Sequence, residues 1–222
     1  MGGSGKAAGP ARVVTVSATY GSSGSLIAPA VAGRLGLPFF DRLIPARGAP
    51  PAGGAAGTAE AGEWLTDDER LASRRTSFLD RLAHLTGGLG LPVPAGVDIG
   101  DHVRELVEHS IRDIAADTGG VILGRAAMIV LAGQPTAFHV RLDGPGERRC
   151  ARAMALEGID EATARERMVE TDRARARYFT RIYGRDAHDP ALYHLVVDST
   201  VLPVEVCVRV IVEAATAFWG DR

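Results

Sequence analysis

Short apolar runs alternate along the chain with longer segments in which apolar residues recur every three or four positions. The short runs predict strands at Val13–Val16, Leu37–Arg42, Gly120–Gly124, Ala137–Leu142 and Leu195–Asp198, of which Gly120–Gly124 would be fully buried. The periodic segments predict helices at Leu26–Leu35, Glu63–Leu85, Val103–Ala115, Gly146–Leu156, Asp160–Arg181 and Pro203–Phe218. Because helices separate most of the strands, the pattern favours an α/β fold built on a parallel sheet. The first helix would carry Pro29 in its first turn, where a missing N–H is tolerated.

Segments of low complexity interrupt this pattern. Residues 1–11 are rich in Gly and Ala and predict a disordered tail, and residues 48–62, dominated by Ala, Gly and Pro, predict a flexible loop. Residues 87–100, which include two prolines, predict another loop. Residues 12–222 have the length of a single domain.

Composition and charge exclude several classes of function. The net charge of −2 and the isoelectric point near 6.3 provide no basic field for nucleic acid or an acidic membrane. Residues 201–219 form the most apolar late segment, but three charged residues interrupt it, so we expect no membrane span. The N-terminus has no signal-peptide profile, and Cys150 and Cys207 offer no disulfide framework. We therefore expect a cytoplasmic protein.

The motifs of several other chemistries are missing. The six histidines and two cysteines show no H-x-x-x-H or C-x-x-C spacing, so we expect no metal site built from them. The turn after the first strand lacks the G-x-S-x-G register of a nucleophile elbow. It also lacks G-x-G-x-x-G, so a dinucleotide site is only weakly indicated.

The candidate chemistry begins in that turn, which reads Gly21, Ser22, Ser23, Gly24, Ser25. Glycine-rich turns that start a helix point main-chain N–H groups at a bound phosphate, and the helix dipole adds to the attraction. A complete P-loop reads G-x-x-x-x-G-K-[ST], and on that template Ser25 fits while Gly24 takes the position of the lysine. On this stretch alone, a β–α turn without a ligand is at least as consistent with the sequence as a nucleotide site.

Polar residues also follow other predicted strands. Asp41 and Arg42 end the second strand, and Arg125 follows the strand that ends at Gly124. Because ligands of parallel sheets bind beyond the carboxyl ends of the strands, we expect these residues and the glycine-rich turn to share one site. Arg125 is equally consistent with a strand cap paired to a carboxylate. Lys6 is the single lysine, so phosphate binding would depend on arginine.

The predicted helix at 160–181 is unusually rich in charge. Its arginines are Arg165, Arg167, Arg173, Arg175, Arg177 and Arg181. Four acidic residues, including Asp172, are interleaved with them, which favours a solvated helix linked by ion pairs. The alternative is that part of the helix folds over the site as a lid.

Five groups of residues follow one another in a distinctive order. They are Ser17 with Tyr20–Gly21–Ser22 and Gly24; Leu35–Arg42; Leu123–Ala127; Glu157–Gly158, Ala164, Thr171–Arg175 and Tyr178; and Tyr193–Ser199. In this order they resemble the motifs of the cytidylate kinase-like family, a branch of the P-loop nucleoside-monophosphate kinases. The resemblance extends from about Arg12 to Phe218, except for about 47–100.

The resemblance implies a three-layer P-loop kinase-like core with a helical region for the monophosphate and a lid at 160–190. The implied reaction moves the γ-phosphate of ATP to a nucleoside monophosphate such as CMP, with Mg²⁺ as cofactor. By position, Gly21 to Ser25 would hold the donor phosphates, with Ser25 near Mg²⁺. The residues implied on the acceptor side are Asp41, Arg42, Arg47 and Arg125. Those implied in catalysis are Arg125, Asp172 and Arg175.

The chain also departs from the family pattern at two places. Ala18 and Thr19 replace an Arg-Glu pair before the turn, and His194 replaces an Asp in the last strand motif. Removing positive charge from the donor loop weakens the stabilisation of the transferring phosphate. Two functions therefore stay open: a nucleotide kinase, and a catalytically degenerate nucleotide sensor or interaction protein that keeps the fold. The partner implied for either is a small-molecule nucleotide, and a homodimer is expected by analogy alone.

Overall fold

The computed structural model describes residues 11–41 and 99–220 of the chain. Its centre is a sheet with the strand order β2-β3-β1-β4-β5. The strands are β1 (Val13–Ala18), β2 (Phe39–Phe40), β3 (Gly120–Leu123), β4 (Ala137–Asp143) and β5 (Leu195–Asp198). Every pair of neighbouring strands in this sheet is parallel, so their carboxyl ends lie along one edge.

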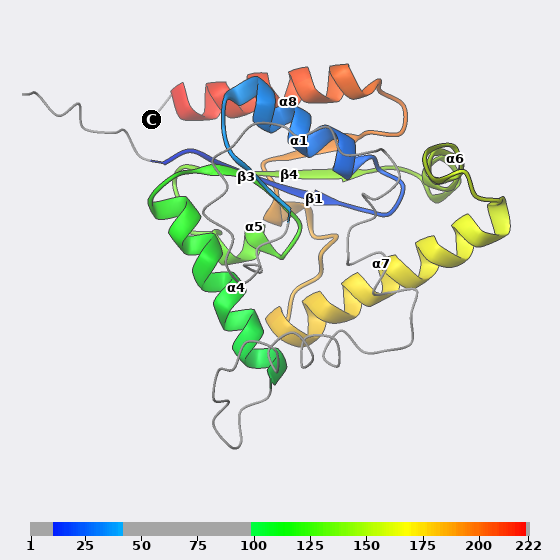
Figure 1. Cartoon of the computed structure of the whole chain (residues 1–222), viewed down its shortest axis with the longest axis horizontal. Coiled ribbons are helices and arrows are strands. Elements are labelled where there is room, and N and C mark those ends of the chain that lie inside the picture. Colours follow the sequence, from blue (N-terminus) through cyan, green and yellow to red (C-terminus); the bar gives the residue numbers. More distant parts are fainter. Residues whose placement is uncertain (1–10, 42–98, 221–222) are drawn as a thin grey trace, which may run out of the picture.

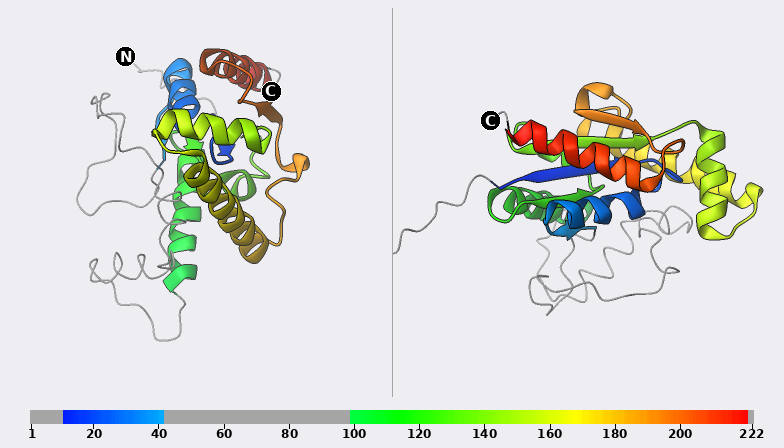
Figure 2. Two further views of the ribbon diagram at one scale, coloured as in Figure 1. Left: turned by 90° about the vertical axis from the view of Figure 1, so that its right-hand side faces the viewer. Right: turned by 90° about the horizontal axis from the view of Figure 1, so that it is seen from above.

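Helices cover both faces of the sheet and extend past its carboxyl edge (Figures 1 and 2). Helices α1 (Gly24–Leu35) and α8 (Val204–Gly220) lie side by side on one face. Helices α4 (Ile99–Ala116) and α5 (Ala127–Val130) lie on the other. Helices α6 (Gly146–Glu157) and α7 (Glu161–Tyr183) follow β4, and η1 (Pro190–Leu192) precedes β5. The α/β fold with a parallel sheet is therefore as predicted.

The apolar side chains of the strands are divided between the two faces. One hydrophobic cluster joins Val14 and Val140 to α1 and α8, and a second joins Val13 and Ile122 to α4. Side chains that alternate between two covered faces explain why the strands read as nearly continuous apolar runs.

One face of β1 and β4 nevertheless carries a buried polar row. Thr15 lies opposite His139, and Ser17 lies opposite Arg141 in the pairing of the two strands. Thr15, His139 and Arg141 are all buried, and the Thr15 hydroxyl lies 2.8 Å from Nδ1 of His139. Parallel strands with both faces covered rarely hold a charged residue, so this row is a candidate for a role other than core packing.

The predicted strands and helices in the described part are confirmed, with differences at their ends. Helix α1 begins at Gly24 rather than Leu26, because the N–H groups of both Leu26 and Ile27 bond the carbonyl of Ser23. Pro29 therefore lies inside the helix and not in its first turn, which corrects the prediction. Helix α4 begins at Ile99, before its predicted start. The short helices α5 and η1 carry no periodicity and were not predicted.

Several sequence-based predictions lie outside the described residues, namely the tail at 1–10, the loop at 48–62, the helix at 63–85 and most of the loop at 87–100. Both cysteines are buried and unpaired, in agreement with the predicted absence of a disulfide framework. None of the helices in the described ranges is at once long enough and apolar enough to cross a membrane.

Candidate functional site

The β1–α1 loop, residues 19–23, lies at the carboxyl edge of the sheet and ends in a left-handed residue. Ser23 has a φ of 62° and caps α1 without a side-chain hydrogen bond. The first N–H groups of a helix have no partner within the helix, and at this end of α1 those groups belong to Gly24 and Ser25. N–H groups at a helix N-terminus and the helix dipole are the features that attract an anion.

Packing explains both glycines of this loop region. A Cβ on Gly21, whose φ is 74°, would overlap the carbonyl oxygen of Arg149 in α6. A Cβ on Gly24 would overlap the Cβ of Ala18. A lysine at position 24, as in a complete P-loop, therefore does not fit unless the main chain moves. The packing of Gly24 against Ala18 therefore accounts for the absence of a lysine at this position.

Ser22 supports the loop from inside. Its hydroxyl donates to the carbonyl of Thr19 at 2.7 Å, and its N–H donates to the same carbonyl at 3.1 Å. The hydroxyl of Ser199, which follows β5, donates to the carbonyl of Ser22 at 2.7 Å. Ser22 is fully buried, so it holds the loop to the end of β5 and does not face a ligand.

Two arginines of α6 reach the loop, and the sequence analysis did not single them out. Arg152 Nη1 donates to the hydroxyl of Ser23 at 3.3 Å and to the carbonyl of Ser199. Arg149 donates through Nη1 to the carbonyl of Tyr20 at 3.1 Å. The sequence feature that could have identified them is a pair of arginines three positions apart on a helix that follows a strand end. The next helix carries many more charged residues, which made this pair less conspicuous.

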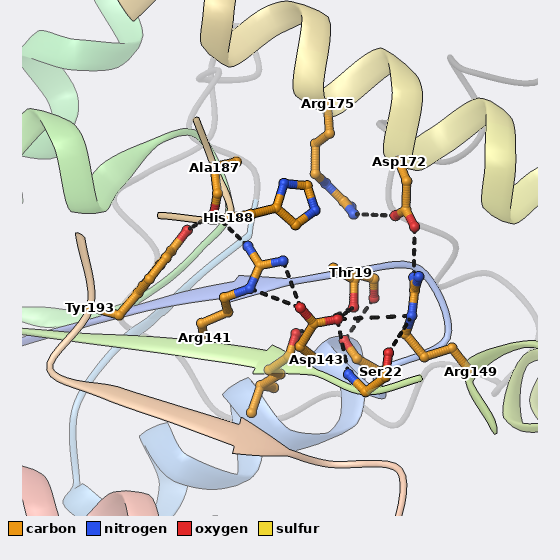
Figure 3. A network of polar contacts seen from close by, with 12 residues as sticks. Thr19, Ser22, Arg141, Asp143, Arg149, Asp172, Arg175, Ala187, His188 and Tyr193 are labelled. Atoms are coloured by element: carbon orange, nitrogen blue, oxygen red, sulfur yellow. Dashed lines mark hydrogen bonds and ion pairs between the residues drawn. The ribbon is translucent and has the colours of Figure 1, made fainter. Parts of the chain in front are cut away.

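Helix α7 brings Asp172 and Arg175 to the same loop (Figure 3). The Asp172 carboxylate accepts a hydrogen bond from Arg149 Nη1 at 2.7 Å and one from the N–H of Tyr20 at 3.3 Å. Arg175 Nη1 lies 3.9 Å from Asp172 Oδ1. That nitrogen is buried and donates no hydrogen bond within the described ranges. The structure thus brings Asp172 onto the predicted loop and places Arg175 next to Asp172.

Asp143, the last residue of β4, links the loop to a buried arginine. Its Oδ1 accepts from the Thr19 hydroxyl and the Gly144 N–H, both at 2.9 Å. Its Oδ2 accepts from Arg141 Nε at 3.0 Å and Nη2 at 2.7 Å. Burial acts to raise the pKa of Asp143, but the hydrogen bonds and charge of Arg141 together with the Gly144 N–H hold it below its ordinary value. Asp143 is therefore a carboxylate in this network.

Arg125 and Asp41 follow the neighbouring strands β3 and β2, at the same edge of the sheet. Gly124, Arg125 and Ala126 have φ values of 72°, 58° and 53°. Two consecutive non-glycine residues in the left-handed region are costly, and such strain is concentrated at functional sites. Arg42 and Arg47, the other two residues predicted for the acceptor, lie outside the described residues.

Two of the remaining arginines of α7 form ion pairs with acidic residues. Arg165 pairs with Glu161 at 2.7 Å, and Arg167 pairs with Glu157 at the same distance. For Arg165 the favoured prediction, a solvated helix linked by ion pairs, is correct, whereas Arg167 joins α7 to Glu157 of α6. The residues with described side chains include no cluster of three or more His, Cys, Asp or Glu that could hold a metal ion.

The sequence profile of the cytidylate kinase-like family matches residues 13–201. The chain belongs to this family. The match runs from β1 past β5 and includes the β1–α1 loop, α6 and α7. The P-loop kinase-like fold expected from the sequence is thereby shown for this cytidylate kinase-like protein.

Relatives support the assignment at modest identity. A cytidylate kinase of Methanopyrus kandleri is 37% identical over 95 residues, which are 39% of this chain and 49% of that protein. The matched stretch thus spans about half the length of that relative. A cytidylate kinase of Aeropyrum pernix is 26% identical over 167 residues, 75% of this chain and 95% of that protein.

A solved structure shares the fold of this cytidylate kinase-like protein. It is the crystal structure of an uncharacterized protein from Eubacterium ventriosum. The two superpose with a TM-score of 0.62 at 17% identity, over 93% of this chain and 99% of that one. At this identity the likeness shows the fold alone.

Proposed function

We propose that this protein is a nucleotide kinase that transfers the γ-phosphate of ATP to a nucleoside monophosphate such as CMP. One observation carries the proposal: arginines of α6 and α7 converge on the N-terminus of α1 at the carboxyl edge of the sheet, in a chain of the cytidylate kinase-like family. The names of the relatives support CMP as the acceptor.

On the donor side, the N–H groups of Gly24 and Ser25 bind the phosphates of ATP. Arg152, whose Nη1 lies 3.3 Å from the Ser23 hydroxyl, supplies positive charge at a loop that cannot accommodate a lysine at Gly24. Phosphoryl transfer depends mainly on positioning and on charge around the transferred group. A guanidinium held beside the loop meets that requirement.

Arg175 acts from α7 on the transferring phosphate. Its Nη1 pairs with Asp172 at 3.9 Å but donates no hydrogen bond within the described ranges, so it can turn to a phosphate oxygen without breaking a hydrogen bond. Asp172 holds α7 against the loop through Arg149 and Tyr20. Arg125 and Asp41, which follow neighbouring strands, bind the acceptor from the β2–β3 side of the same edge.

Mg²⁺ fits this site as an ion carried by the nucleotide. Ser25 is exposed in the first turn of α1 and offers one hydroxyl, and the carboxylate of Asp143 is already bonded by Arg141. Such a donor set suits an ion that takes most of its ligands from phosphates and water. When bound, Mg²⁺ would neutralise charge on the phosphates. The chain would hold it through Ser25.

The test is release of ADP from ATP with a panel of nucleoside monophosphates, compared between the wild type and Arg175→Gln. We expect turnover with one monophosphate, and a loss of at least tenfold in kcat for the variant. Arg165→Gln, which removes an exposed arginine of the same helix, should keep wild-type turnover. If no monophosphate raises ADP release above the background with ATP alone, the kinase proposal is wrong.

A specific observation favours the second candidate, a catalytically degenerate nucleotide sensor or interaction protein. The contact between Gly24 and Ala18 leaves no room for the lysine that binds the donor phosphates in a complete P-loop. The loop therefore lacks one positive charge that phosphoryl transfer uses. Nucleotide binding without any transfer, measured by titration on the same preparation, would support this candidate over the kinase. The homodimer and the cytoplasmic location stay predictions from the sequence.

A further inference from the structure

Arg141 is a buried charged residue near the carboxyl end of β4, and it joins two parts of the molecule. Only 6% of its surface is exposed. Nε and Nη2 donate to the carboxylate of Asp143, and Nη1 donates to the carbonyl of Ala187. Figure 3 shows the guanidinium between these two partners.

The Ala187 side of this bridge belongs to the α7–β5 connection, residues 184–194. The guanidinium of Arg141 lies 5.7 Å from the centroid of the Tyr193 ring. The Tyr193 hydroxyl donates to the carbonyl of Ala187 at 2.8 Å, so both ends of this short stretch contact Arg141. Tyr193 and Ala187 also pack in one apolar cluster with Phe179 near the end of α7. The connection is therefore tied both to Arg141 and to α7.

The Asp143 side of the bridge belongs to the β1–α1 loop. While Oδ2 of Asp143 accepts from Arg141, Oδ1 accepts from the Thr19 hydroxyl and from the N–H of Gly144. Gly144 in turn accepts a hydrogen bond from Arg149 Nε at 2.9 Å, and Arg149 also bonds the loop at Tyr20. A displacement of the Arg141 guanidinium would thus change the hydrogen bonds that hold the start of the loop.

Stability alone does not account for an arginine at this position. A buried ion pair costs desolvation that its attraction seldom exceeds, and an apolar residue of similar volume is often as stable or more so. Position 141 lies between Val140 and Leu142 in a strand that is otherwise well suited to apolar side chains. The geometry, a bidentate bond to one element and a carbonyl bond to another, is what an apolar residue could not reproduce.

We propose that Arg141 is a positioning residue that couples the α7–β5 connection to the β1–α1 loop, so that a ligand bound at the loop orders residues 187–193. Its effect on turnover rests on the proposed kinase function, whereas the coupling itself does not. Any anion that binds at the loop would act on residues 187–193 through the same hydrogen bonds of Arg141.

Hydrogen–deuterium exchange of the full chain tests the bridge directly. In Arg141→Met, we expect the amides of Thr19, Ser22 and Gly144 and those of Leu192 and Tyr193 to exchange at least tenfold faster than in the wild type. Arg141→Lys keeps the positive charge but loses the planar set of N–H donors, so its exchange rates should lie between those of the wild type and those of Arg141→Met. The matched control is Thr15→Val, which removes another buried polar group of the same row.

The pattern of exchange decides between coupling and simple destabilisation. A rise in both groups of amides, without a similar rise at Val121 in β3, supports the proposal. A rise confined to one group, or one shared evenly with β3 as in Thr15→Val, overturns it. This result stands whether or not the protein turns over nucleotide.

A ligand adds a second readout that a merely structural residue would not change. Inorganic pyrophosphate should slow exchange at residues 187–193 of the wild type, and this protection should be lost in Arg141→Met although calorimetry still detects binding. Retained protection in the variant would overturn the proposal. If the wild type binds no pyrophosphate, the proposed donor site is wrong, and the exchange of the free protein alone decides the coupling. With turnover, kcat should fall at least tenfold in Arg141→Met while the KM for ATP changes less than threefold.

Discussion

The carboxylate of Asp172 accepts a hydrogen bond from the main-chain N–H of Tyr20 at 3.3 Å, across 152 positions of the sequence. This N–H belongs to the loop at which we place the donor phosphates. The same carboxylate pairs with Arg149 at 2.7 Å. An acidic side chain of α7 thus holds the helix to the loop and offsets part of the positive charge there. An anionic ligand has to bind in the presence of this carboxylate.

Removing that negative charge should strengthen anion binding. In Asp172→Asn the amide oxygen can still accept from Tyr20, so the fold should persist while repulsion of phosphate is relieved. We expect the Kd for pyrophosphate to fall by about threefold to tenfold, and the gain to shrink in high salt. Calorimetric titration measures it. Glu170→Gln, the same change of charge at an exposed position of α7, should have little effect, and weaker binding by Asp172→Asn would contradict this reading.

Replacing Arg152 should weaken ATP binding. Charge-assisted hydrogen bonds to phosphate are among the stronger contacts in proteins, so Arg152→Met should raise the Kd for ATP at least tenfold, about 1.4 kcal/mol. Arg148→Met is the control, because Arg148 lies on the same helix but is half exposed and pairs with Asp198 at 3.4 Å. Equal losses in both variants would show that general charge, and not the position of Arg152, determines affinity. A thermal melt confirms that each variant is folded.

Restoring the lysine of a complete P-loop should destabilise this protein. Gly24→Lys places a Cβ against the Cβ of Ala18, and such overpacking costs on the order of 2–4 kcal/mol. Ala18→Gly removes the obstructing atom, so the double variant should recover most of the free energy of unfolding lost by the single one. Urea denaturation of the four proteins forms a double-mutant cycle. Additive effects, with no recovery, would mean that the two positions do not interact.

Acid should destabilise the fold through His139. Burial first, and the neighbouring His194 second, lower the pKa of His139 from 6.5 to about 4. The unfolded chain binds this proton near pH 6.5 and the folded chain only near pH 4, so stability is complete above pH 6.5 and declines as the pH falls toward 4. Between pH 7 and pH 4.5 the loss attributable to His139 should be about 2–3 kcal/mol.

The free energy of unfolding at the two pH values, compared with that of His139→Gln, isolates this contribution. Glutamine can still hydrogen-bond Thr15 but does not titrate, so its stability should depend less on pH. If His139→Gln declines as steeply as the wild type, carboxylates such as Asp143, whose pKa is also lowered, cause the whole effect.

Within the described residues, the sequence determined the strands, the longer helices and the place of the β1–α1 loop. The apolar run at Gly120–Leu123 and the periodicity of α8 show which side chains face the core. This information lies within each segment and needs no knowledge of the rest of the fold. The carboxyl ends of parallel strands share an edge, so the positions of the loop, Asp41 and Arg125 at one edge followed from the pattern alone. The start of α1 was wrong by two residues, because the left-handed Ser23 that sets it leaves no trace in hydrophobic periodicity.

Only the tertiary structure decided which charges meet at that edge. Arg149 and Arg152 reach the loop because α6 lies across it, whereas Arg165 of the next helix points to Glu161. Nothing local distinguishes these arginines, since each stands on a predicted helix among charged neighbours. The partners of Arg141, at Asp143 and at Ala187, are likewise set by how the α7–β5 connection passes the end of β4. Periodicity encodes burial, whereas contacts between distant segments depend on the packing of whole helices against the sheet, which no single stretch of sequence contains.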